Sequence, residues 1–320
     1  MDEEIENHWA YEQMDDLINA DIIDGVMDKY NNMFVKPNDY VTRAQFVKII
    51  VTALGLENEG NGKAFSDVKA GTWYYDYVQT ASSLDIVTGK PGGKFAPNDK
   101  ITRAEMAKII VDAFKHSVVF PETSSKAFDD VDAKSWAYQY INQAAAAEIV
   151  FGNKNKYSPS NSATRAEAMA IVHRALQKEQ SDVVEDAALI AFITDFIKSE
   201  DALTEVNDQA GLQELYEANT TGYYKAEMAE YGGDFENIVE EGEEFTFTIN
   251  DENMAVNVLE KSNHFATVEV SGITVFVKYK SDGLNMDYTF ELEGVYKLKK
   301  NSNDGGWKIY SYYPYFSEEE

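Results

Sequence analysis

The feature of this 320-residue chain that most constrains its fold is a tripeptide, Thr-Arg-Ala, that occurs three times. Each copy stands five residues after a proline, and further upstream a tryptophan always precedes a glycine by sixteen residues. These landmarks are Trp9, Gly25, Pro37 and Thr42, then Trp73, Gly89, Pro97 and Thr102, and last Trp136, Gly152, Pro159 and Thr164. The gap from glycine to proline varies, at twelve, eight and seven residues. Two fixed blocks are therefore joined by a surface loop of variable length in each of three repeats.

Each repeat is expected to form a helix, a loop and a second helix. After Trp136 the run from Ala137 to Ile149 is rich in alanine, and after each Thr-Arg-Ala apolar residues return at helical spacing. The residues of these second helices are Phe46, Val47, Ile50, Val51 and Leu54, then Met106, Ile109, Ile110, Val111 and Phe114, then Met169, Ile171, Val172 and Leu176. Two short helices cannot bury such faces alone, so we expect the three repeats to pack into one body.

The start of each second helix carries the pattern of a capping box. A threonine is followed three residues later by Gln or Glu, so the hydroxyl can accept a backbone N–H and the longer side chain can reach back. The pairs are Thr42 with Gln45, Thr102 with Glu105, and Thr164 with Glu167. We expect these six residues to support the helix starts.

Arginine is almost confined to the repeated tripeptide. The chain has four arginines, of which Arg43, Arg103 and Arg165 occupy the first helical position and Arg174 has no counterpart in the other repeats. A cation there faces the positive end of the helix dipole, and free N–H groups beside it favour an anion. We therefore expect each planar guanidinium to bind a carboxylate ligand. The alternative is an ion pair with an Asp or Glu of a neighbouring repeat.

Two further residue types complete the candidate sites. Trp9, Trp73 and Trp136 suit either a hydrophobic core or stacking on a sugar ring, and both interpretations stay open. Gly25, Gly89 and Gly152 suit unusual backbone geometry, with close ligand approach as a second use. Arg174 is expected to be a solvated surface residue.

The repeats resemble the S-layer homology (SLH) domain, in triplicate, over roughly residues 1–178. The resemblance rests on Phe-x-Asp-Val, the tryptophan, Ile/Val-x-Gly, Phe/Tyr-x-Pro and Ile/Val/Ala-Thr-Arg-Ala-Glu/Gln. It implies a mainly α pseudo-threefold trimer that binds secondary cell-wall polysaccharide, a glycan bearing a pyruvate ketal, in grooves between repeats. Residues 1–58, 59–119 and 120–180 are the expected repeats, the first clipped at its start. Gln45 and Ala163 depart from the pattern, so we expect unequal grooves, with that around Arg103 the most typical.

Composition separates the two halves of the chain. The net charge is −28, of which residues 181–320 contribute −21. Such acidity argues against nucleic acid as a partner. The chain has no cysteine, which excludes disulfides and thiolate metal sites, and no run of 18 apolar residues that could span a membrane. We expect neither a metal nor a cofactor.

Residues 186–320 are expected to form a separate acidic α+β domain. Amphipathic helices are predicted around Leu189–Ile197 and over Asp208–Tyr231, the latter ended by Gly232-Gly233. Alternating segments then predict a curved antiparallel sheet, with hairpin turns at Asp282-Gly283 and Asp304-Gly305. These predicted strands contain Phe245, Phe247 and Ile249; Ala266, Val268 and Val270; Ile273, Val275, Val277 and Tyr279; Tyr288, Phe290 and Leu292; Tyr296 and Leu298; and Trp307 and Ile309.

This order of helices and strands resembles the cystatin-like or NTF2-like roll. Some relatives of that roll are pocket enzymes that use an Asp and a His, but this part has one histidine, His264, without an evident partner. We therefore predict a non-enzymatic, monomeric cell-surface protein of a Gram-positive-type bacterium, anchored to the wall and displaying its C-terminal domain. The alternative is an anchored enzyme with a pocket in the roll.

Overall fold

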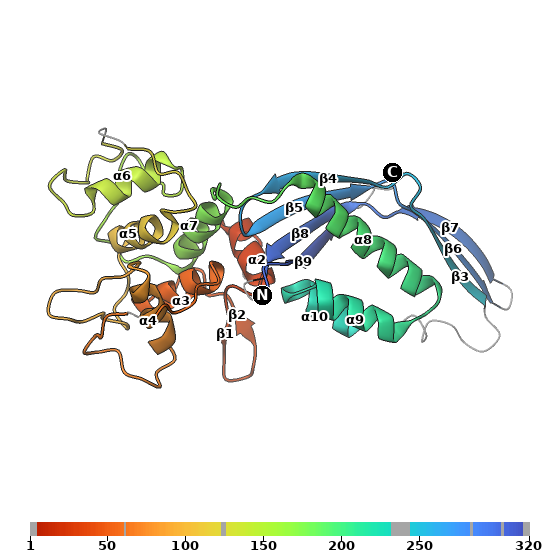
Figure 1. Cartoon of the computed structure of the whole chain (residues 1–320), viewed down its shortest axis with the longest axis horizontal. Coiled ribbons are helices and arrows are strands. Elements are labelled where there is room, and N and C mark those ends of the chain that lie inside the picture. The colour runs from red at the N-terminus through yellow and green to blue at the C-terminus, as the bar shows by residue number, and fades with distance from the viewer. Residues whose placement is uncertain are drawn as a thin grey trace. The chain divides into compact units, whose positions relative to one another are not determined.

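The computed structural model describes residues 5–60, 62–122, 126–231, 244–281, 284–301 and 304–315. The chain divides into two compact units, which are described separately (Figure 1). Unit 1 comprises Met1–Ile18 and Ile22–Val183, and unit 2 comprises Asn19–Asp21 and Val184–Glu320. No helix in the described part of the chain is both long and apolar enough to cross a membrane.

Unit 1 is built mainly from short helices. In chain order its elements are α2 (Tyr11–Asn19), β1 (Val26–Met27), β2 (Met33–Phe34), α3 (Arg43–Ala53), α4 (Tyr75–Ser83), α5 (Arg103–Phe114), α6 (Tyr138–Ala146) and α7 (Arg165–Gln177). The helices that follow Thr-Arg-Ala, α3, α5 and α7, pack against one another. Their predicted apolar faces are buried, which confirms the helical periodicity read from the sequence.

A closed ring of backbone hydrogen bonds joins the segments that precede these helices. The N–H of Val41 donates to the carbonyl of Ala163 (3.1 Å), that of Ala163 to Ile101 (2.9 Å), and that of Ile101 to Val41 (3.0 Å). Each segment thus donates to one neighbour and accepts from the other. All three residues are fully buried, so these polar groups need partners, and only the other two repeats supply them.

The three capping boxes are confirmed. Thr42, Thr102 and Thr164 accept from the backbone N–H three residues on. The side chains of Gln45, Glu105 and Glu167 accept from the threonine N–H in return, at 2.8, 2.9 and 2.9 Å. Short helices that lack strong propensity depend on such caps for a defined first turn.

The residue before each repeated proline has the same unusual backbone. Lys36, Ala96 and Ser158 have φ angles of 55°, 60° and 58°, in the left-handed region. Such a conformation is uncommon for residues with a Cβ and persists only where surrounding contacts impose it. The first repeat therefore shares this turn with the other two.

Unit 2 consists of three helices and two antiparallel sheets. The helices are α8 (Asp186–Glu205), α9 (Gln209–Asn219) and α10 (Gly222–Tyr231). The strands are β3 (Glu244–Asn250), β4 (Ala255–Lys261), β5 (Phe265–Ser271), β6 (Thr274–Ser281), β7 (Leu284–Glu291), β8 (Gly294–Lys300) and β9 (Trp307–Pro314). The sheet orders are β3-β6-β7 and β4-β5-β8-β9. The chain thus changes sheet after β3, after β5 and after β7, whereas β4–β5, β6–β7 and β8–β9 are consecutive strands paired within one sheet.

The bend between β5 and β6 requires glycine. Gly272 has φ +75°, and a Cβ there would lie 2.3 Å from the carbonyl oxygen of Asn253, which is too close for any side chain. The bend between β3 and β4 is therefore packed directly against it. Both bends redirect strands from one sheet to the other.

The predicted antiparallel strands are present, but the prediction of a meander in one curved sheet is wrong: the strands form two sheets, in which β3 pairs with β6 and β5 with β8. Two further errors concern single elements. Strand β4 was missed, because the register shift between Val258 and Glu260 breaks its alternation. The predicted helix from Asp208 to Tyr231 is two helices, because Thr220 adopts an extended conformation at the end of α9. The turn at Asp304-Gly305 is confirmed, with Gly305 at φ +71°. The turn at Asp282-Gly283, the helix end at Gly232-Gly233 and the side chains of Phe245 and Phe247 lie outside the described residues.

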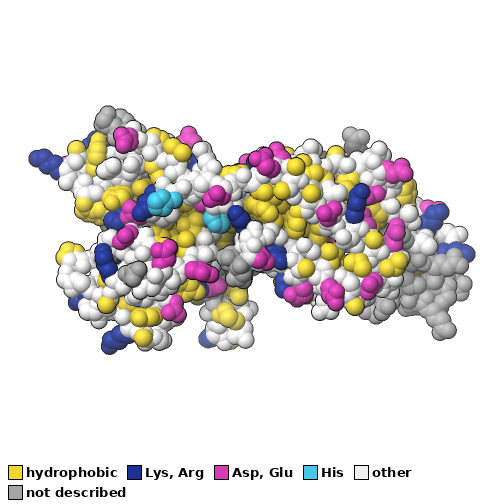
Figure 2. Space-filling model, viewed as in Figure 1, with side chains coloured by type: hydrophobic (Ala, Val, Ile, Leu, Met, Phe, Trp, Pro, Cys, Tyr) yellow, Lys and Arg dark blue, Asp and Glu magenta, His cyan; other side chains and the backbone are white. Residues whose placement is uncertain are grey.

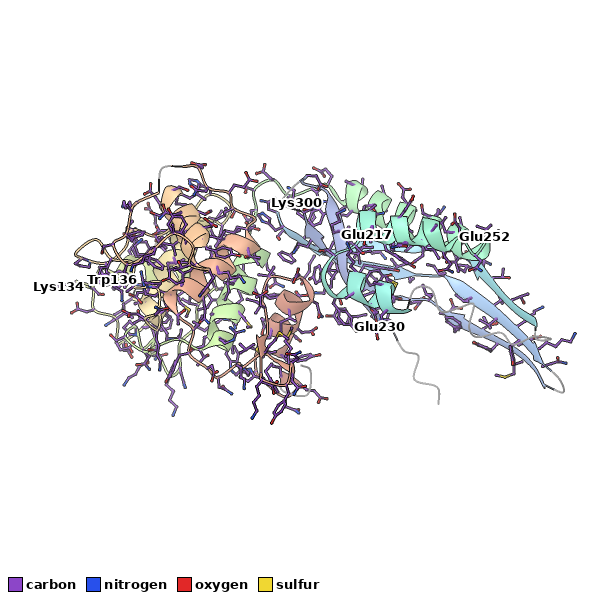
Figure 3. All side chains as sticks on the ribbon, turned by 90° about the horizontal axis from the view of Figure 1, so that it is seen from below. Lys134, Trp136, Glu217, Glu230, Glu252 and Lys300 are labelled. Carbon is purple, nitrogen blue, oxygen red and sulfur yellow. The ribbon has the colours of Figure 1, made fainter. Side chains whose placement is uncertain are left out.

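The core of unit 2 lies between α8 and the four-stranded sheet. It contains Leu189, Ile193, Phe196 and Ile197 of α8, Tyr224 of α10, and Ala266, Val268, Val270, Ile273, Tyr296, Leu298 and Ile309 of the strand region. On β5 every second residue is buried, as a sheet with one covered face requires. Acidic side chains such as Glu217 and Glu252 point outward from this unit (Figure 3).

One carboxyl group lies among the tyrosines of this core. Burial raises the pKa of Glu200 to about 7; the hydrogen bond from the Tyr216 hydroxyl (2.8 Å) opposes that rise, and the neighbouring charge of Asp201 adds to it. The native state therefore keeps a proton that the unfolded chain releases above about pH 4.5. Stability must fall as the pH rises through the window from about 4.5 to 7.

We predict that Glu200→Gln stabilises unit 2 above pH 7, because a neutral amide removes the cost of the buried charge. The gain should be on the order of 3 kcal/mol at pH 8 and close to zero at pH 4. Hydrogen exchange of β5 and β8 amides in the full chain, followed by mass spectrometry, measures it. Glu214→Gln, at an exposed position of α9, is the control. Equal protection of Glu200→Gln and wild type at pH 8 would contradict the assignment.

Candidate functional site

The three repeated arginines begin α3, α5 and α7, and their backbone is held by the neighbouring repeat. The N–H groups of Arg43, Arg103 and Arg165 donate to carbonyls of that repeat at 2.9, 2.9 and 2.8 Å, and the following alanines donate to its proline carbonyl. These helix N-termini are therefore occupied within the protein. The expectation that free N–H groups there favour an outside anion is wrong.

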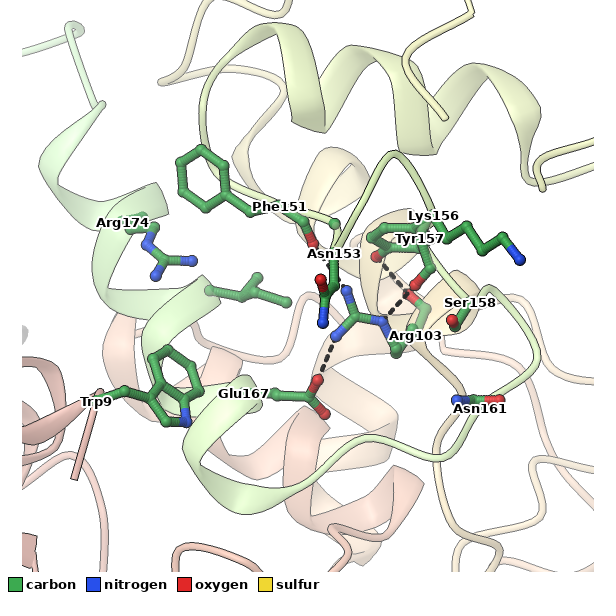
Figure 4. A pocket seen from close by; sticks show the side chains of 12 residues that line it. Trp9, Arg103, Phe151, Asn153, Lys156, Tyr157, Ser158, Asn161, Glu167 and Arg174 are labelled. Carbon is green, nitrogen blue, oxygen red and sulfur yellow. Dashed lines mark hydrogen bonds and ion pairs between the residues drawn. The ribbon is translucent and has the colours of Figure 1, made fainter. Parts of the chain in front are cut away.

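The guanidinium of Arg103 is surrounded on three sides (Figure 4). Its Nε donates to the Tyr157 carbonyl at 2.7 Å, and one terminal nitrogen donates to the Phe151 carbonyl at 2.9 Å. The other terminal nitrogen pairs with the Glu167 carboxylate. The group also lies over the Tyr157 ring, 4.6 Å from its centroid. Lysine could not make this set of planar contacts.

The other two arginines are held in the same way. Arg43 donates through Nε to the Phe95 carbonyl at 2.9 Å and pairs with Glu105 at 3.0 Å. Arg165 donates through Nε to the Val35 carbonyl at 2.7 Å and through a terminal nitrogen to the carbonyl of Asp24 at 3.1 Å. Arg43 and Arg165 are only 5% and 8% exposed, so much of each guanidinium serves the fold.

The ion-pair alternative holds for Arg43 and Arg103. Glu105 and Glu167 each use one carboxylate oxygen for the capping box and the other for the arginine of the preceding repeat. The argument that only an outside acid balances these two cations is therefore wrong. In the first repeat the corresponding residue is Gln45, which can cap the helix but carries no charge.

A carboxylate from the Phe-x-Asp-Val motif fixes the loop that receives each arginine. Asp130 accepts the N–H groups of Tyr157 and Ser158, both at 2.8 Å. Burial acts to raise the pKa of Asp130, but these hydrogen bonds, one from its own N–H and the charge of Lys156 together lower that pKa. Asp67 does the same for the N–H groups of Phe95 and Ala96. The carbonyls that bind Arg103 and Arg43 are thereby held in place.

The repeated glycines allow these loops to approach the phenylalanine of the same motif. A Cβ on Gly89 would lie 2.5 Å from the Phe65 ring, and one on Gly152 would lie 2.6 Å from the Phe128 ring and 2.4 Å from the Lys156 carbonyl. No side chain fits at either position. Their use is thus close packing, and Gly25 occupies the corresponding loop position beside Asp24.

A pocket of about 480 Å³ surrounds Arg103. Its other lining residues are Trp9, Phe151, Gly152, Asn153, Lys156, Tyr157, Ser158, Asn161, Glu167, Ile171 and Arg174. Figure 4 shows the indole of Trp9 and the guanidinium of Arg174 across the pocket from Lys156. The pocket therefore brings together residues of all three repeats.

A second pocket, of about 290 Å³, surrounds Arg43. It is lined also by Ile86, Val87, Thr88, Gly89, Lys90, Pro91, Glu105, Lys108, Ile109 and Trp136. The composition follows the same rule as the first: an arginine from one repeat, a glycine loop and glutamate from the next, and a tryptophan from the remaining one. Trp136 lies near the surface of unit 1 (Figure 3).

The tryptophans of the repeats are exposed. Trp9, Trp73 and Trp136 are 61%, 54% and 59% accessible, so the core interpretation is wrong, and the indole faces of Trp9 and Trp136 are available in the pockets. Arg174 was also misread as a solvated surface residue. It lines the first pocket, half-buried over the Phe151 ring at 4.7 Å, where burial lowers its pKa.

Both pockets carry an excess of positive charge in a strongly acidic chain. Three cations and one carboxylate line the pocket at Arg103, namely Lys156, Arg174 and Arg103 itself against Glu167. The lining of the pocket at Arg43 also holds three cations and one carboxylate, Lys90, Lys108 and Arg43 with Glu105, but Lys90 pairs in addition with Asp99 and Lys108 with Asp112. In α7 the position of Lys108 is taken by Ala170, and Arg174 supplies the third cation one turn later.

The comparisons with known proteins match this part of the chain. Residues 64–107 and 127–169 match the S-layer homology domain family, so the second and third repeats are SLH domains. The chain is 33% identical over 174 residues to the Surface-layer 125 kDa protein of Lysinibacillus sphaericus, covering 53% of this chain and 14% of that protein. It is 30% identical over 165 residues to the Middle cell wall protein of Brevibacillus brevis, covering 50% and 14%.

Enzymes are also among the relatives. The chain is 35% identical over 179 residues to the Amylopullulanase of Thermoanaerobacterium thermosulfurigenes, covering 55% of this chain and 9% of that protein. The enzyme matches cover only the SLH part. The chain thus spans less than a fifth of the length of these three relatives. Together the matches support a cell-surface location and binding to the cell wall.

A solved structure is also similar, the intermembrane space region of the chloroplast protein ARC6. It is 13% identical and covers 42% of this chain and 98% of that one, at a TM-score of 0.27. A score this low does not define a fold.

We predict that Glu167→Gln destabilises unit 1 by about 1–2 kcal/mol, because the amide keeps the cap but loses the ion pair with Arg103. Glu167→Ala should cost about 1 kcal/mol more through loss of the capping box. Urea unfolding measures both.

Glu148→Gln is the control for this prediction. It breaks an ion pair with Lys178 that lies at the surface, with side chains 71% and 43% exposed, and should change the free energy of unfolding much less than Glu167→Gln does. Equal losses for Glu148→Gln and Glu167→Gln would show that the Arg103 pair has no special role.

Proposed function

We propose that the three repeats form one non-enzymatic anchoring module that holds the chain on the bacterial wall. The module binds secondary cell-wall polysaccharide in the grooves between repeats. The observation that carries this proposal is the shared composition of the two pockets: a net positive lining, an exposed indole face and a loop held close by glycine. Indole faces suit sugar rings, and cations suit an acidic substituent.

The acidic substituent proposed is the carboxylate of a pyruvate ketal. At Arg103 one of the three cations is offset by Glu167, which leaves Lys156 and Arg174 to meet a ligand charge. At Arg43 the two lysines also pair with protein carboxylates, Lys90 with Asp99 and Lys108 with Asp112, so a ligand there would compete with these pairs. At Arg103 the second and third cations are Lys156 and Arg174, on opposite sides of the pocket (Figure 4). A charged ligand between them would replace water with charge-assisted hydrogen bonds.

The first repeat is proposed to complete a third groove. The rule followed by the two pockets places Arg165, Gly25, Gln45 and Trp73 together there. The contacts of Arg165 with Asp24 and Val35 support this arrangement, because they match those of Arg103 with Phe151 and Tyr157. The closed hydrogen-bond ring supports a pseudo-threefold body of three SLH repeats.

Unit 2 is proposed to be an acidic domain of the cystatin-like or NTF2-like class that the monomeric protein displays. Its interior between α8 and the sheet is filled by aromatic and aliphatic side chains. The alternative is an enzyme anchored by unit 1, as the amylopullulanase match allows. That alternative needs a catalytic pocket in which a carboxyl group with a shifted pKa lies near His264. Glu200, whose pKa is raised, instead accepts a hydrogen bond from the Tyr216 hydroxyl.

We predict that Trp9→Ala and Trp136→Ala each reduce affinity for wall polysaccharide purified from the producing bacterium by about threefold to tenfold. An exposed aromatic face contributes about 0.5–1.5 kcal/mol beyond its buried area. Calorimetric titration of the full chain measures the affinity. Tyr223→Ala, at a half-exposed position of unit 2, is the control. If both tryptophan variants bind the polysaccharide as tightly as wild type does, these pockets are not the binding sites.

The acidic substituent has its own test. Chemical removal of pyruvate from the same polysaccharide should weaken binding, and Arg103→Lys should weaken binding to the untreated polysaccharide by about 1–3 kcal/mol. Because Arg103 also stabilises the fold, its variant is compared at a temperature where circular dichroism shows it folded. Equal binding of treated and untreated polysaccharide would rule out the ketal.

A further inference from the structure

The β1–β2 hairpin lies in a loop of unit 1 that is longer in the first repeat than in the other two. Twelve residues separate Gly25 from Pro37, against eight and seven in the later repeats. The extra residues form a two-stranded ribbon in which Val26 pairs with Phe34 and Met27 with Met33. Figure 1 shows it extending away from the helices of unit 1.

The hairpin exposes apolar side chains. Met27, Tyr30 and Met33 are 57%, 71% and 45% accessible, and Val26 is 41% accessible. Figure 2 shows hydrophobic side chains on this projection. A ribbon this small buries almost none of its own apolar surface, so its composition does not serve the core.

The tip of the hairpin has a defined conformation. One carboxylate oxygen of Asp28 accepts from the N–H groups of Tyr30 and Asn32, at 2.7 and 3.0 Å, and the other accepts from the Asn32 amide at 3.2 Å. Asn31 adopts the left-handed conformation at φ 65°. Tyr30 is thus presented on a built turn.

The base of the hairpin is attached to the groove arginine. Arg165 donates to the carbonyls of Asp24 and Val35, one on each side of the hairpin. In the pocket at Arg103 the same two contacts are made to Phe151 and Tyr157, both of which line that pocket. By this equivalence the hairpin rises from the rim of the groove that contains Arg165.

The hairpin combines aromatic rings with cations. Lys29 lies over the Tyr30 ring and Lys36 over the Phe34 ring, each 4.7 Å from the centroid. A ring face next to an ammonium group suits a sugar that carries negative charge. The same chemistry characterises the two pockets described above.

We propose that the β1–β2 hairpin forms an additional carbohydrate subsite, with Tyr30 stacking on a second sugar of the glycan chain whose end lies in the Arg165 groove. This inference rests on the proposed function. On this proposal the Arg165 groove has a higher affinity for the polysaccharide than for a single terminal sugar, because the hairpin contacts a second sugar. Met27 and Met33 of the same hairpin add exposed apolar surface that can adapt to the outline of a sugar.

The test uses the full chain with Trp9→Ala and Trp136→Ala, which weakens the pockets at Arg103 and Arg43 and so raises the share of binding that the Arg165 groove contributes. Into this background Tyr30→Ala and Tyr30→Phe are introduced. The probes are the purified wall polysaccharide and its pyruvylated terminal monosaccharide. We expect Tyr30→Ala to lower affinity for the polysaccharide by about threefold to tenfold, with the monosaccharide unchanged and Tyr30→Phe like the background.

Each other outcome overturns a defined part of this inference. Unchanged polysaccharide affinity in Tyr30→Ala excludes the subsite. An equal loss for the monosaccharide makes the hairpin part of the primary groove rather than a second subsite. A background that no longer binds, while wild type does, excludes the Arg165 groove and leaves the proposed function intact. Absence of binding by wild type itself refutes the proposed function.

Discussion

Each Thr-Arg-Ala helix is completed by the repeat beside it, and the rest of unit 1 depends on this exchange. The backbone hydrogen bonds that link Val41, Ala163 and Ile101 close on themselves, so no repeat has a full set of partners without the other two. The glutamates extend the exchange to side chains, since one carboxylate both caps its own helix and pairs with a neighbour's arginine. Local capping and assembly are thereby coupled in single residues.

The sequence predicted what is local and missed what depends on assembly. Capping boxes and helical faces follow from spacings of three or four residues, and all three copies formed as expected. The glutamates that pair with Arg43 and Arg103 lie more than sixty residues away in sequence, and the packing of repeats brings them close. The position of Arg174 in the pocket lining was also missed, because Arg174 has no counterpart in the other repeats and its place in the pocket depends on their packing.

In unit 2 the sequence pattern located most of the strands but did not predict their order, because β3 pairs with β6 and β5 with β8 in two separate sheets. Alternation predicted six segments, yet the irregular register of β4 hid a seventh strand. No sequence motif predicted that Glu200 would lie among tyrosines, because Tyr216, Tyr224 and Tyr296 come from α9, α10 and the sheet. The raised pKa of Glu200 therefore depends on burial that only the folded unit produces.

The composition of the pockets limits how the module can change. Each pocket takes one wall from every repeat, so deleting a single repeat dismantles all of them at once. A substitution in one glycine loop, by contrast, alters one groove and spares its siblings. The lining of one pocket can therefore change without loss of the others, while the number of repeats cannot. The longer loop of the first repeat, which forms the β1–β2 hairpin, is a local change of this kind.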